Sequence, residues 1–534
     1  MKNHKVSIII IFCITGLLYS CIKDKFNFDN VAGGQYNPDV AAPLIHTKLT
    51  LSDLLGEYDS SNVITEDSNS FLTLIYRNPV YSKEANEFID IPNQPINTNI
   101  IFTVPPGLGP GDSVIIPYSE DYYFTVNNDE ILDSIFVKTN GISTMDFNLN
   151  SDINHYAKIE ITIPSATKYG TPFKKIMPFD YTGTLPISQS FSLSGYKITF
   201  LDSNKIIINY DLIVYGDANP DNSPYFISMG DGIIDIQFSK VFGYLSQHFF
   251  DIDIDTVSLD IFKNKIEGIF NLEDPKVNIY VSNSFGFPIS ANFVQMGTHS
   301  DDNAPYDVSV SGSGIPAPWK INYPTVSEIG QKIETSLILN KTNSNIKDAI
   351  NISPRYLFCK LTALSNPEGM IEQNFALDTS KLDVDIEVEL PLYGRAWDFV
   401  NKDTLDFEID DVDELESILF KLNINNGFPI DGKVQIYFTD TLYTVLDSLL
   451  SSFQQVIASA VPGGPPDYKV ISPTNKTTTI LFDKNRLNNI VNTKKMILKT
   501  KLATSDNGNT IVKIYSDYNM EIRLAARAQL SLDF

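Results

Sequence analysis

Side chains that could carry catalysis are few and scattered in this sequence. After residue 20 the chain has four histidines, at positions 46, 155, 248 and 299, and no two of them lie four residues apart. The sequence contains no HExxH, CxxC or Gly-x-Ser-x-Gly motif, and the glycine-rich stretch SVSGSGIPAPW is not followed by a phosphate-loop lysine. These absences disfavour metal-dependent, nucleophilic and phosphoryl-transfer chemistry. We therefore expect no enzyme and no bound cofactor.

One acidic turn has the spacing of metal ligands. Asp217, Asn219 and Asp221 stand at alternate positions, like the first ligands of an EF-hand loop. The central glycine is absent, and residue 228, where the loop needs a glutamate, is Ser. The acidic run from Asp406 to Glu416 is a second candidate. We predict solvated turns and no metal site, and name the first three residues only as calcium candidates.

Carboxylates and aromatic side chains leave two alternatives open. The 65 Asp and Glu residues could include a glycosidase-type acid pair, but nothing in the sequence singles one out. Trp319, Trp397 and the tyrosines could form a platform for sugars, although aromatic residues on half-buried strands usually belong to the core. Glycan binding and acid-dependent hydrolysis therefore remain as alternatives to a non-enzymatic role.

The first 21 residues have the pattern of an export signal. Lys2 and Lys5 precede an uncharged apolar run over residues 6–18, and these roughly 13 residues are fewer than the roughly 20 of a membrane-spanning helix. The run ends in LYSC, residues 18–21, which resembles the bacterial lipobox. The resemblance implies cleavage before Cys21 and attachment there of several acyl chains, palmitate among them, which together give a stable anchor.

The resemblance also suggests where the protein resides. Residues 1–20 are predicted to be a lipoprotein signal peptide and residues 21–45 a lipidated tether. Lys23-Asp24 partly resembles the charged export signal of surface lipoproteins of the Bacteroidota. We expect lipid anchoring in the outer membrane, with the cell surface favoured over the periplasmic face.

Composition limits the partners of the chain. Loss of residues 1–20 removes two of the 40 Lys and Arg residues and none of the 65 Asp and Glu residues, so the mature net charge is 38 − 65 = −27. Nucleic acids and anionic membrane surfaces would repel such a chain. Cys13 lies in the signal, which leaves Cys359 as the single mature cysteine besides Cys21 and excludes an internal disulfide. Cys359 alternates with leucines and is predicted to be buried.

Apolar residues recur with a period of two along most of the chain. In KLDVDIEVELPLY, residues 381–393, aliphatic side chains alternate with charged ones, which is typical of an antiparallel strand with one wet face. The sequence predicts an all-β fold of several antiparallel β-sandwich modules with a few short helices. We expect the helices at residues 49–58, 327–339 and 446–461, and the modules at residues 46–215, 216–398 and 399–534.

A strand–bend–strand pattern recurs in the sequence. VNIYVSNSFGFPISANF begins at Val277 and FKLNINNGFPIDGKVQIYF at Phe420, with Asn283 matching Asn426. A fainter copy begins at Asp146. Each copy is interpreted as a hairpin, and its Asn-aromatic-Pro bend resembles the hairpin of LEA/water-stress-type β-sandwiches. Other stretches, such as LTLSDLLGEYD and ELPLYG, resemble uncharacterised lipoproteins of the Bacteroidota.

Six Asp-(Ser/Thr)-aliphatic triplets resemble the general O-glycosylation site of the Bacteroidota. Their hydroxyl residues are Ser113, Ser134, Thr256, Thr404, Thr441 and Ser448. Glycosylation at any of them would require that the side chain is exposed.

The combined pattern predicts a non-enzymatic outer-membrane lipoprotein. It would bind a protein partner, such as an outer-membrane barrel, as an accessory subunit of an assembly or transport complex. Leu530, Leu532 and Phe534 alternate at the chain end and resemble the terminal strand signal of such barrels. Because the charged strand faces and irregular spacing argue against a membrane-embedded sheet, we expect this strand to close a sandwich instead.

Overall fold

A computed structural model describes residues 35–50, 62–179, 185–262, 267–301, 304–407 and 412–533. These residues form antiparallel strands almost throughout, with two short α-helices, α3 (Ile346–Asn351) and α4 (Lys484–Ile490). Four 3₁₀ turns accompany them: η1 (Ala85–Glu87), η2 (Asp202–Asn204), η3 (Asp260–Phe262) and η4 (Val326–Glu328). The predicted all-β class with a few short helices is therefore confirmed.

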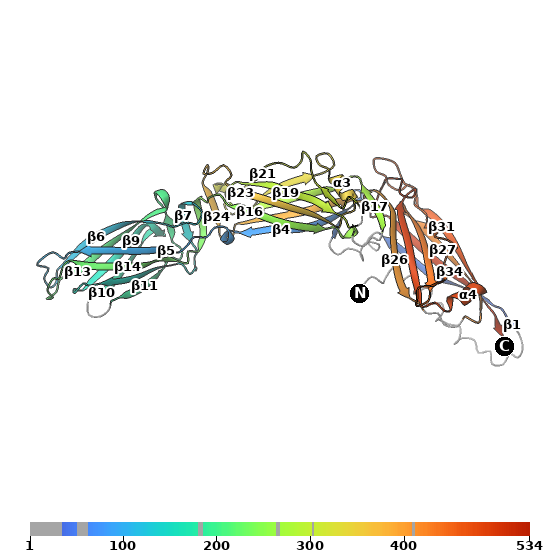
Figure 1. Ribbon diagram of the computed structural model, residues 1–534, viewed down its shortest axis with the longest axis horizontal. Helices are drawn as coiled ribbons and strands as arrows, with labels where there is room; N and C mark the ends of the chain where they lie inside the picture. The colour runs from blue at the N-terminus through green and yellow to red at the C-terminus, as the bar shows by residue number, and fades with distance from the viewer. Residues whose placement is uncertain are drawn as a thin grey trace.

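Three two-layered sandwiches lie end to end in an elongated, bent molecule (Figure 1). The first sandwich pairs an eight-stranded sheet with a four-stranded one. The larger sheet contains β24 (Asn374–Leu377), β15 (Phe238–Tyr244), β7 (Ile131–Val137), β12 (Lys197–Thr199), β9 (Ala157–Lys168), β10 (Thr171–Phe179), β13 (Lys205–Tyr215) and β6 (Ser113–Tyr123). The smaller sheet contains β11 (Ile187–Ser192), β8 (Thr144–Ser151), β14 (Tyr225–Ile234) and β5 (Gln94–Phe102).

The second sandwich, in the middle, pairs two five-stranded sheets. One contains β16 (Phe249–Ser258), β23 (Tyr356–Ser365), β19 (Ile289–His299), β20 (Asp307–Ser309) and β21 (Trp319–Ile321). The other contains β22 (Ile333–Leu339), β18 (Lys276–Asn283), β25 (Lys381–Pro391), β4 (Leu72–Glu84) and β3 (Asn62–Glu66).

The third sandwich pairs a seven-stranded sheet with a four-stranded one. The larger contains β17 (Glu267–Leu272), β26 (Tyr393–Asp406), β32 (Lys495–Thr504), β28 (Ile430–Thr439), β29 (Val445–Ser448), β30 (Gln454–Ile457) and β33 (Val512–Lys513). The smaller contains β2 (Asp39–Thr50), β34 (Asn519–Leu530), β27 (Leu415–Asn426) and β31 (Thr474–Asp483). The short strands β1 (Gln35–Tyr36) and β35 (Leu532–Asp533) pair beside it.

Alternating sequence explains why these segments are strands. In β25, Leu382, Val384, Ile386, Val388 and Leu390 are all at most 3% exposed, as the period of two predicts. Successive strand side chains point to opposite faces, so the intervening charged residues lie on the outer face of the sheet. Burial of one face against the opposing sheet supplies the main stabilisation of each sandwich.

The chain passes through the three sandwiches in nested order. It begins in the third sandwich with β2, enters the second with β3 and β4, and reaches the first with β5. It returns through the second sandwich between β16 and β25 and then enters the third with β26, while β17 and β24 reach out to the third and first sandwiches on the way. The predicted modules are consecutive in sequence, with boundaries after residues 215 and 398. In the structure β8 pairs with β14 across the first boundary, and β26 runs through the second. The period of two does not reveal pairing partners, which is why this nesting is invisible in the sequence.

The recurring bends are arches between sheets, not hairpins within one sheet. Strands β18 and β19 belong to opposite sheets, as do β27 and β28, and β8 and β9. In two copies the Asn side-chain oxygen accepts a hydrogen bond from the backbone N–H two residues on: Asn283 from Phe285 and Asn426 from Phe428, both at 2.9 Å. Both Phe side chains are fully buried. Each is therefore held in the core at the point where the chain crosses from one sheet to the opposing one.

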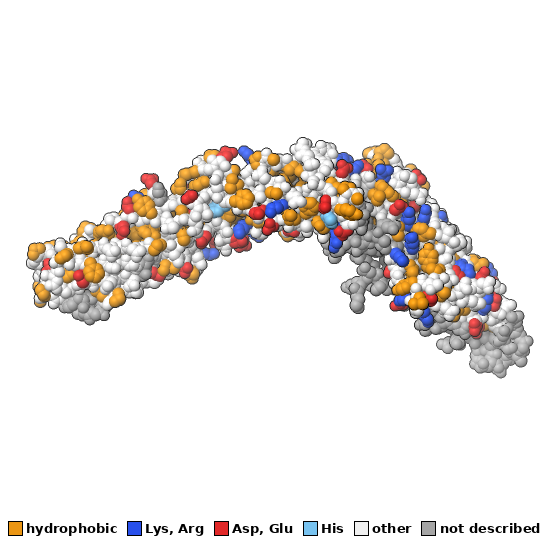
Figure 2. Space-filling model, viewed as in Figure 1, with side chains coloured by type: hydrophobic (Ala, Val, Ile, Leu, Met, Phe, Trp, Pro, Cys, Tyr) orange, Lys and Arg blue, Asp and Glu red, His pale blue; other side chains and the backbone are white. Residues whose placement is uncertain are grey.

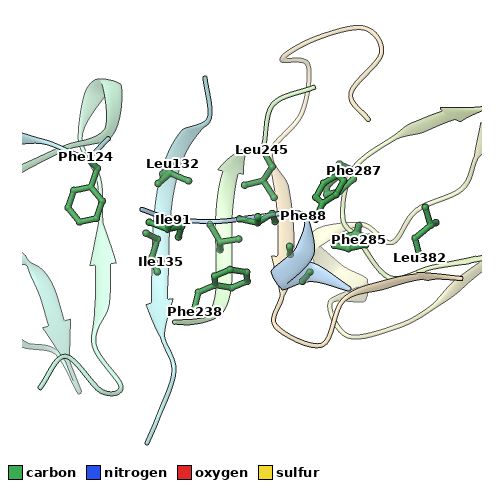
Figure 3. Packing of buried hydrophobic residues seen from close by; sticks show 14 of the residues in the cluster. Phe88, Ile91, Phe124, Leu132, Ile135, Phe238, Leu245, Phe285, Phe287 and Leu382 are labelled. Atoms are coloured by element: carbon green, nitrogen blue, oxygen red, sulfur yellow. The ribbon is translucent and has the colours of Figure 1, made fainter. Parts of the chain in front are cut away.

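The first and second sandwiches share one continuous hydrophobic core. Figure 3 shows Phe88 between Leu132 and Leu245 on one side and Phe285 and Phe287 on the other. The Phe88 ring lies 4.7 Å from that of Phe250 and 5.6 Å from that of Phe287. This continuous packing fixes the two sandwiches relative to each other. The third sandwich has a separate core cluster, and a smaller cluster at its junction with the second sandwich includes Leu72 of β4.

Two predicted helices are strands. Residues 327–339 form the end of η4, a turn and β22, because Gly330 has a φ of +87° that ends the helical turn. Residues 446–461 contain β29 and β30, which pair with β28 at the edge of the larger sheet. The third predicted helix, 49–58, starts inside β2 and otherwise lies outside the described residues.

The helices that do form have local signals. Asp483 caps α4, since its carboxylate accepts a hydrogen bond from the backbone N–H of Arg486 at 3.0 Å. In α3, Ile346, Ala349 and Ile350 are buried at helical spacing. The last long strand, β34, lies between β2 and β27 inside the four-stranded sheet and ends at Leu530. Leu532 of the expected terminal strand belongs instead to β35, which pairs with β1, and Phe534 lies outside the described residues.

Candidate functional site

The predicted lipidation site, Cys21, lies outside the described residues. The described chain begins and ends at the same place, since Gln35 and Tyr36 of β1 pair with Asp533 and Leu532 of β35. This place is the outer end of the third sandwich (Figure 1). Within the ranges that the structure describes, no helix has the length and hydropathy needed to cross a membrane.

The candidate calcium residues form a hydrogen-bonded turn in the first sandwich. Asp217 Oδ1 lies 2.9 Å from Nδ1 of the buried His155 and accepts the backbone N–H of Asn219 at 2.8 Å. Asp221 Oδ1 accepts both the N–H and the hydroxyl of Ser223, and these bonds lower the pKa of Asp221. Asn219 also donates to Asp217 Oδ2 at 3.3 Å and to the Asn154 carbonyl at 2.7 Å, so these side chains take part in the hydrogen bonds of the turn. Among the described residues, no three His, Cys, Asp or Glu side chains are grouped to hold a metal.

The six candidate glycosylation residues differ in exposure. Four are exposed: Ser113, Thr256, Thr404 and Thr441. Ser448 is half-buried, and its hydroxyl donates to the carbonyl of Leu450 at 3.0 Å. Ser134 is 7% exposed in the middle of β7, so it does not meet the condition of exposure. Glycosylation of the other residues stays a prediction.

The four histidines occupy separate environments. His46 lies 2.6 Å from Glu521 on the surface of the third sandwich. His155 is buried beside Asp217, and His248 packs against Phe88 at the first junction. His299 lies between Asp301 and Asp307 at the surface of the second sandwich, and its hydrogen bond to Asp307 is the main cause of its raised pKa.

Cys359 and Trp319 belong to the core. Cys359 is 3% exposed in β23, and burial raises the pKa of its thiol to about 12, so it is not a nucleophile at neutral pH. The predicted burial of Cys359 is therefore confirmed. Trp319 is 6% exposed and stacks on Phe293 with ring centroids 5.8 Å apart. It cannot serve as a platform for a ligand.

Trp397 remains available at the surface of the third sandwich. It lies in β26, is partly exposed, and has the Arg395 guanidinium 5.6 Å from its ring centroid. The loop that follows β32 packs against it, because a Cβ at Gly508 would lie 2.4 Å from the Trp397 Cβ. Gly508 has a φ of +89°, so a residue with a side chain would be strained there as well as obstructed.

Basic residues are concentrated in the third sandwich. The last 142 residues carry 15 Lys and Arg against 18 Asp and Glu, whereas the first 392 residues carry 25 against 47. Figure 2 shows Lys and Arg side chains in a column along this sandwich. Strand register places several of them on one face of the larger sheet: Lys499 is opposite Lys402, and Lys501 is opposite Lys433.

A small polar pocket lies on this face, at the end nearer the second sandwich. Its charged and amide lining consists of Asp398, Asp431, Lys433, Gln455, Lys501 and Asn507. Lys501 Nζ is 2.5 Å from Asp398 Oδ1. Asp431 Oδ1 accepts the Gln455 amide at 2.5 Å and the backbone N–H of Ser459 at 2.9 Å.

Backbone geometry opens this pocket. Asp398 and Asn507 have φ values of +56° and +52°, so both residues are held in the left-handed region. Gly432 and Ala503 complete the lining and present almost no side chain. A Cβ at Gly432 would lie 2.8 Å from the Ile457 side chain, so β30 approaches closely only because residue 432 is glycine. An aspartate and an asparagine, residue types that tolerate the left-handed region, and two small residues thus shape this concave surface.

The pocket combines cationic donors, carboxylate acceptors and amides within one concave surface. Such a set suits a polar ligand with both hydroxyl and anionic groups. Sequence reasoning missed it, although Lys499 and Lys501 alternate in β32, a spacing that puts both on one strand face. Lys433, Gln455 and Asp398 come from other strands, and their convergence depends on the sheet order.

Fold and pocket together place the chain in the class of tandem β-sandwich proteins with a polar surface pocket. No family model matches the sequence, and no curated protein matches it. The comparisons therefore assign no family.

Among solved structures, a predicted secreted protein from Parabacteroides distasonis is similar over 54% of this chain and 89% of its own, at 12% identity and a TM-score of 0.29. Structures of the Gt and Gx strains of infectious bursal disease virus cover 89% and 91% of this chain and 82% and 85% of their own. Both are 7% identical, with TM-scores of 0.14 and 0.12. TM-scores this low carry no argument about function.

Proposed function

We propose that the chain is a non-enzymatic, lipid-anchored outer-membrane protein that binds a partner at the cell surface. The observation that carries this proposal is the nested path, which brings both ends of the described chain to one end of a long molecule. Gln35 lies fourteen positions after Cys21, and a fully extended segment of that length reaches at most about 50 Å. An anchor at Cys21 would hold the third sandwich nearest the membrane and present the first sandwich farthest from it.

The far end of the first sandwich supports a binding role. Three loops meet there: Gly216 donates to the Asp112 carbonyl at 3.0 Å, and Asn154 donates to the Pro220 carbonyl at 2.6 Å. Near these loops Ile101 is 78% exposed and lies opposite Phe226, which is 39% exposed. Neighbouring exposed apolar side chains beside hydrogen-bonded loops suit a protein-binding surface. A partner protein, such as an outer-membrane barrel within an assembly or transport complex, fits this arrangement.

Substitution of the lipidation residue tests the anchor. We expect Cys21→Ala to abolish labelling by radioactive palmitate and to release the protein from the outer-membrane fraction. Cys359→Ala is the matched control, because it removes the other mature cysteine and leaves the anchor intact. Palmitate labelling that survives Cys21→Ala would contradict the proposal. Affinity isolation from detergent-solubilised membranes then identifies the partner, expected in equimolar amount.

Glycan binding at the cell surface is the second candidate function. The polar pocket beside Trp397 favours it, since proteins that bind sugars combine hydrogen-bonding side chains with an aromatic surface. Acid-dependent hydrolysis by a carboxylate pair is the second alternative, and the two pocket carboxylates already have partners: Asp398 pairs with Lys501, and Asp431 accepts from Gln455 and Ser459.

A further inference from the structure

We propose that the pocket of the third sandwich binds a carboxylate-bearing sugar, such as a hexuronic acid residue of an acidic glycan. This inference rests on the second candidate function, glycan binding, and adds the class of sugar and the residues that select it. It does not depend on the lipid anchor.

Lys433 is the cation that selects the ligand. It lines the pocket, and within the described residues it has no hydrogen bond or ion pair with another side chain. Lys501, by contrast, is paired with Asp398. An ammonium group without a partner in the protein, beside the Lys501–Asp398 ion pair, can pair with an anionic group on a ligand.

Carboxylates and amides of the same pocket can bind sugar hydroxyls. The Asp398 side chain is 58% exposed, so it can accept a hydrogen bond in addition to that from Lys501. Asp431 Oδ1 is occupied by Gln455 and Ser459, while Oδ2 has only a long contact of 3.5 Å with the backbone N–H of Asn507. Oδ2 is therefore free to accept a hydroxyl group.

The charge balance favours a carboxylate over a phosphate or sulfate-rich group. Two aspartates and two lysines line the pocket, so a dianionic phosphate would meet the repulsion of Asp398 and Asp431 as well as the attraction of Lys433 and Lys501. A singly charged carboxylate pairs with Lys433, while the hydroxyls around the sugar ring donate to the aspartates.

Trp397 is not among the residues that line the pocket, but two of its neighbours place its apolar side chain beside them. It precedes the pocket residue Asp398 in β26 and packs against Gly508, which follows the pocket residue Asn507. The nonpolar face of a pyranose ring can lie against a partly exposed indole while its hydroxyls reach the pocket.

Isothermal titration calorimetry with the purified full-length protein tests the inference. The probes are trigalacturonic acid, the neutral trisaccharide galactotriose, and sodium acetate and inorganic phosphate as free anions. We expect trigalacturonic acid to bind at least tenfold more tightly than each of the other three, and its affinity to fall as salt is raised.

Two lysine variants separate the pocket from general basicity. Lys433→Met should weaken binding of trigalacturonic acid at least tenfold, and Lys433→Arg should keep most of it. Lys421→Met is the matched control, since Lys421 is exposed on the opposing sheet of the same sandwich. Circular dichroism melting curves establish that each variant is folded.

Each other outcome overturns the inference. Equal binding of galactotriose would leave glycan binding standing but remove the selection for acidic sugars. Acetate or phosphate binding as tight as that of the trisaccharide would define a simple anion site. Unchanged affinity in Lys433→Met would place the sugar elsewhere, and absence of binding by both trisaccharides would count against glycan binding as well.

Discussion

The pKa of His248 is set by its burial at the junction between the first two sandwiches. Its ring centroid is 4.3 Å from that of Phe88, and its Nε2 lies 2.9 Å from the Leu245 carbonyl oxygen and 3.9 Å from Glu130. Burial lowers the pKa of His248, and the nearby Glu130 carboxylate only partly opposes this effect. The folded protein therefore favours the neutral imidazole.

The lowered pKa predicts a loss of stability in acid. Below about pH 6.5, the ordinary pKa of histidine, the unfolded chain binds a proton at His248 that the folded chain does not yet bind, so unfolding is favoured as pH falls. We expect His248→Gln, which can still donate to the Leu245 carbonyl, to lose less stability than the native protein between pH 7.5 and pH 5.5. Urea unfolding in a Trp397→Phe background, where Trp319 reports on the second sandwich, measures this. Parallel pH dependence in the two proteins would contradict it.

Arches between sheets are the elements that build each sandwich. In the third sandwich Asn426 is fully buried, and its amide donates to the carbonyls of Ile430 and Ala458, both at 2.9 Å, while its oxygen accepts from Phe428. One side chain thus satisfies three backbone groups inside the bend, where water cannot reach them. Phe428 lies edge-on to Tyr518 with ring centroids 6.1 Å apart, which fixes the bend in the core.

Removal of the Asn426 amide should destabilise the third sandwich. We expect Asn426→Ala to lower its free energy of unfolding by about 3 kcal/mol, because buried backbone groups lose their partners. Asn423→Ala on the same strand is the control, with an expected loss below about 1 kcal/mol, since its partners Asn475 and Thr477 lie on the outer face near water. Urea unfolding followed by Trp397 fluorescence in a Trp319→Phe background resolves the two. Equal effects would mean that the arch does not depend on its asparagine.

The sequence predicts strands correctly where polar and apolar residues alternate over a long stretch. The prediction failed where this alternation is short. Residues 446–461 have enough leucine and alanine for a helix, yet the buried Gln435 of β28 accepts the Leu450 N–H at 2.9 Å and donates to its carbonyl at 2.7 Å. These tertiary hydrogen bonds hold the segment against the sheet edge and override its local preference.

At the scale of the molecule, the nested path sets the shape. Leu72, at the start of β4, shares a core cluster with residues of the third sandwich, and the core around Phe88 joins the second sandwich to the first. Phe71 packs against Tyr515 with ring centroids 5.7 Å apart, so aromatic contact also links the start of β4 to the third sandwich. The result is a long molecule whose two described ends lie together.

Small-angle X-ray scattering tests this shape. The sample is a chain from Asp29 to Phe534, which lacks the signal and Cys21. A compact domain of that length has a radius of gyration of about 23 Å, and we expect a clearly larger value. A concentration series controls for self-association. A value close to that of a compact domain would mean that the sandwiches pack side by side.

The sequence by itself determined the strands, their buried faces and the bends. Alternation along β25, burial of Cys359 and the matching of Asn283 with Asn426 follow from local periodicity and turn chemistry, which need no knowledge of distant residues. Only the tertiary structure decided which strands pair, that the bends cross between sheets, and that Lys433, Lys501 and Asp398 line one pocket. The reason is that a strand's period fixes which face is buried, while its partners are chosen by packing among segments hundreds of residues apart.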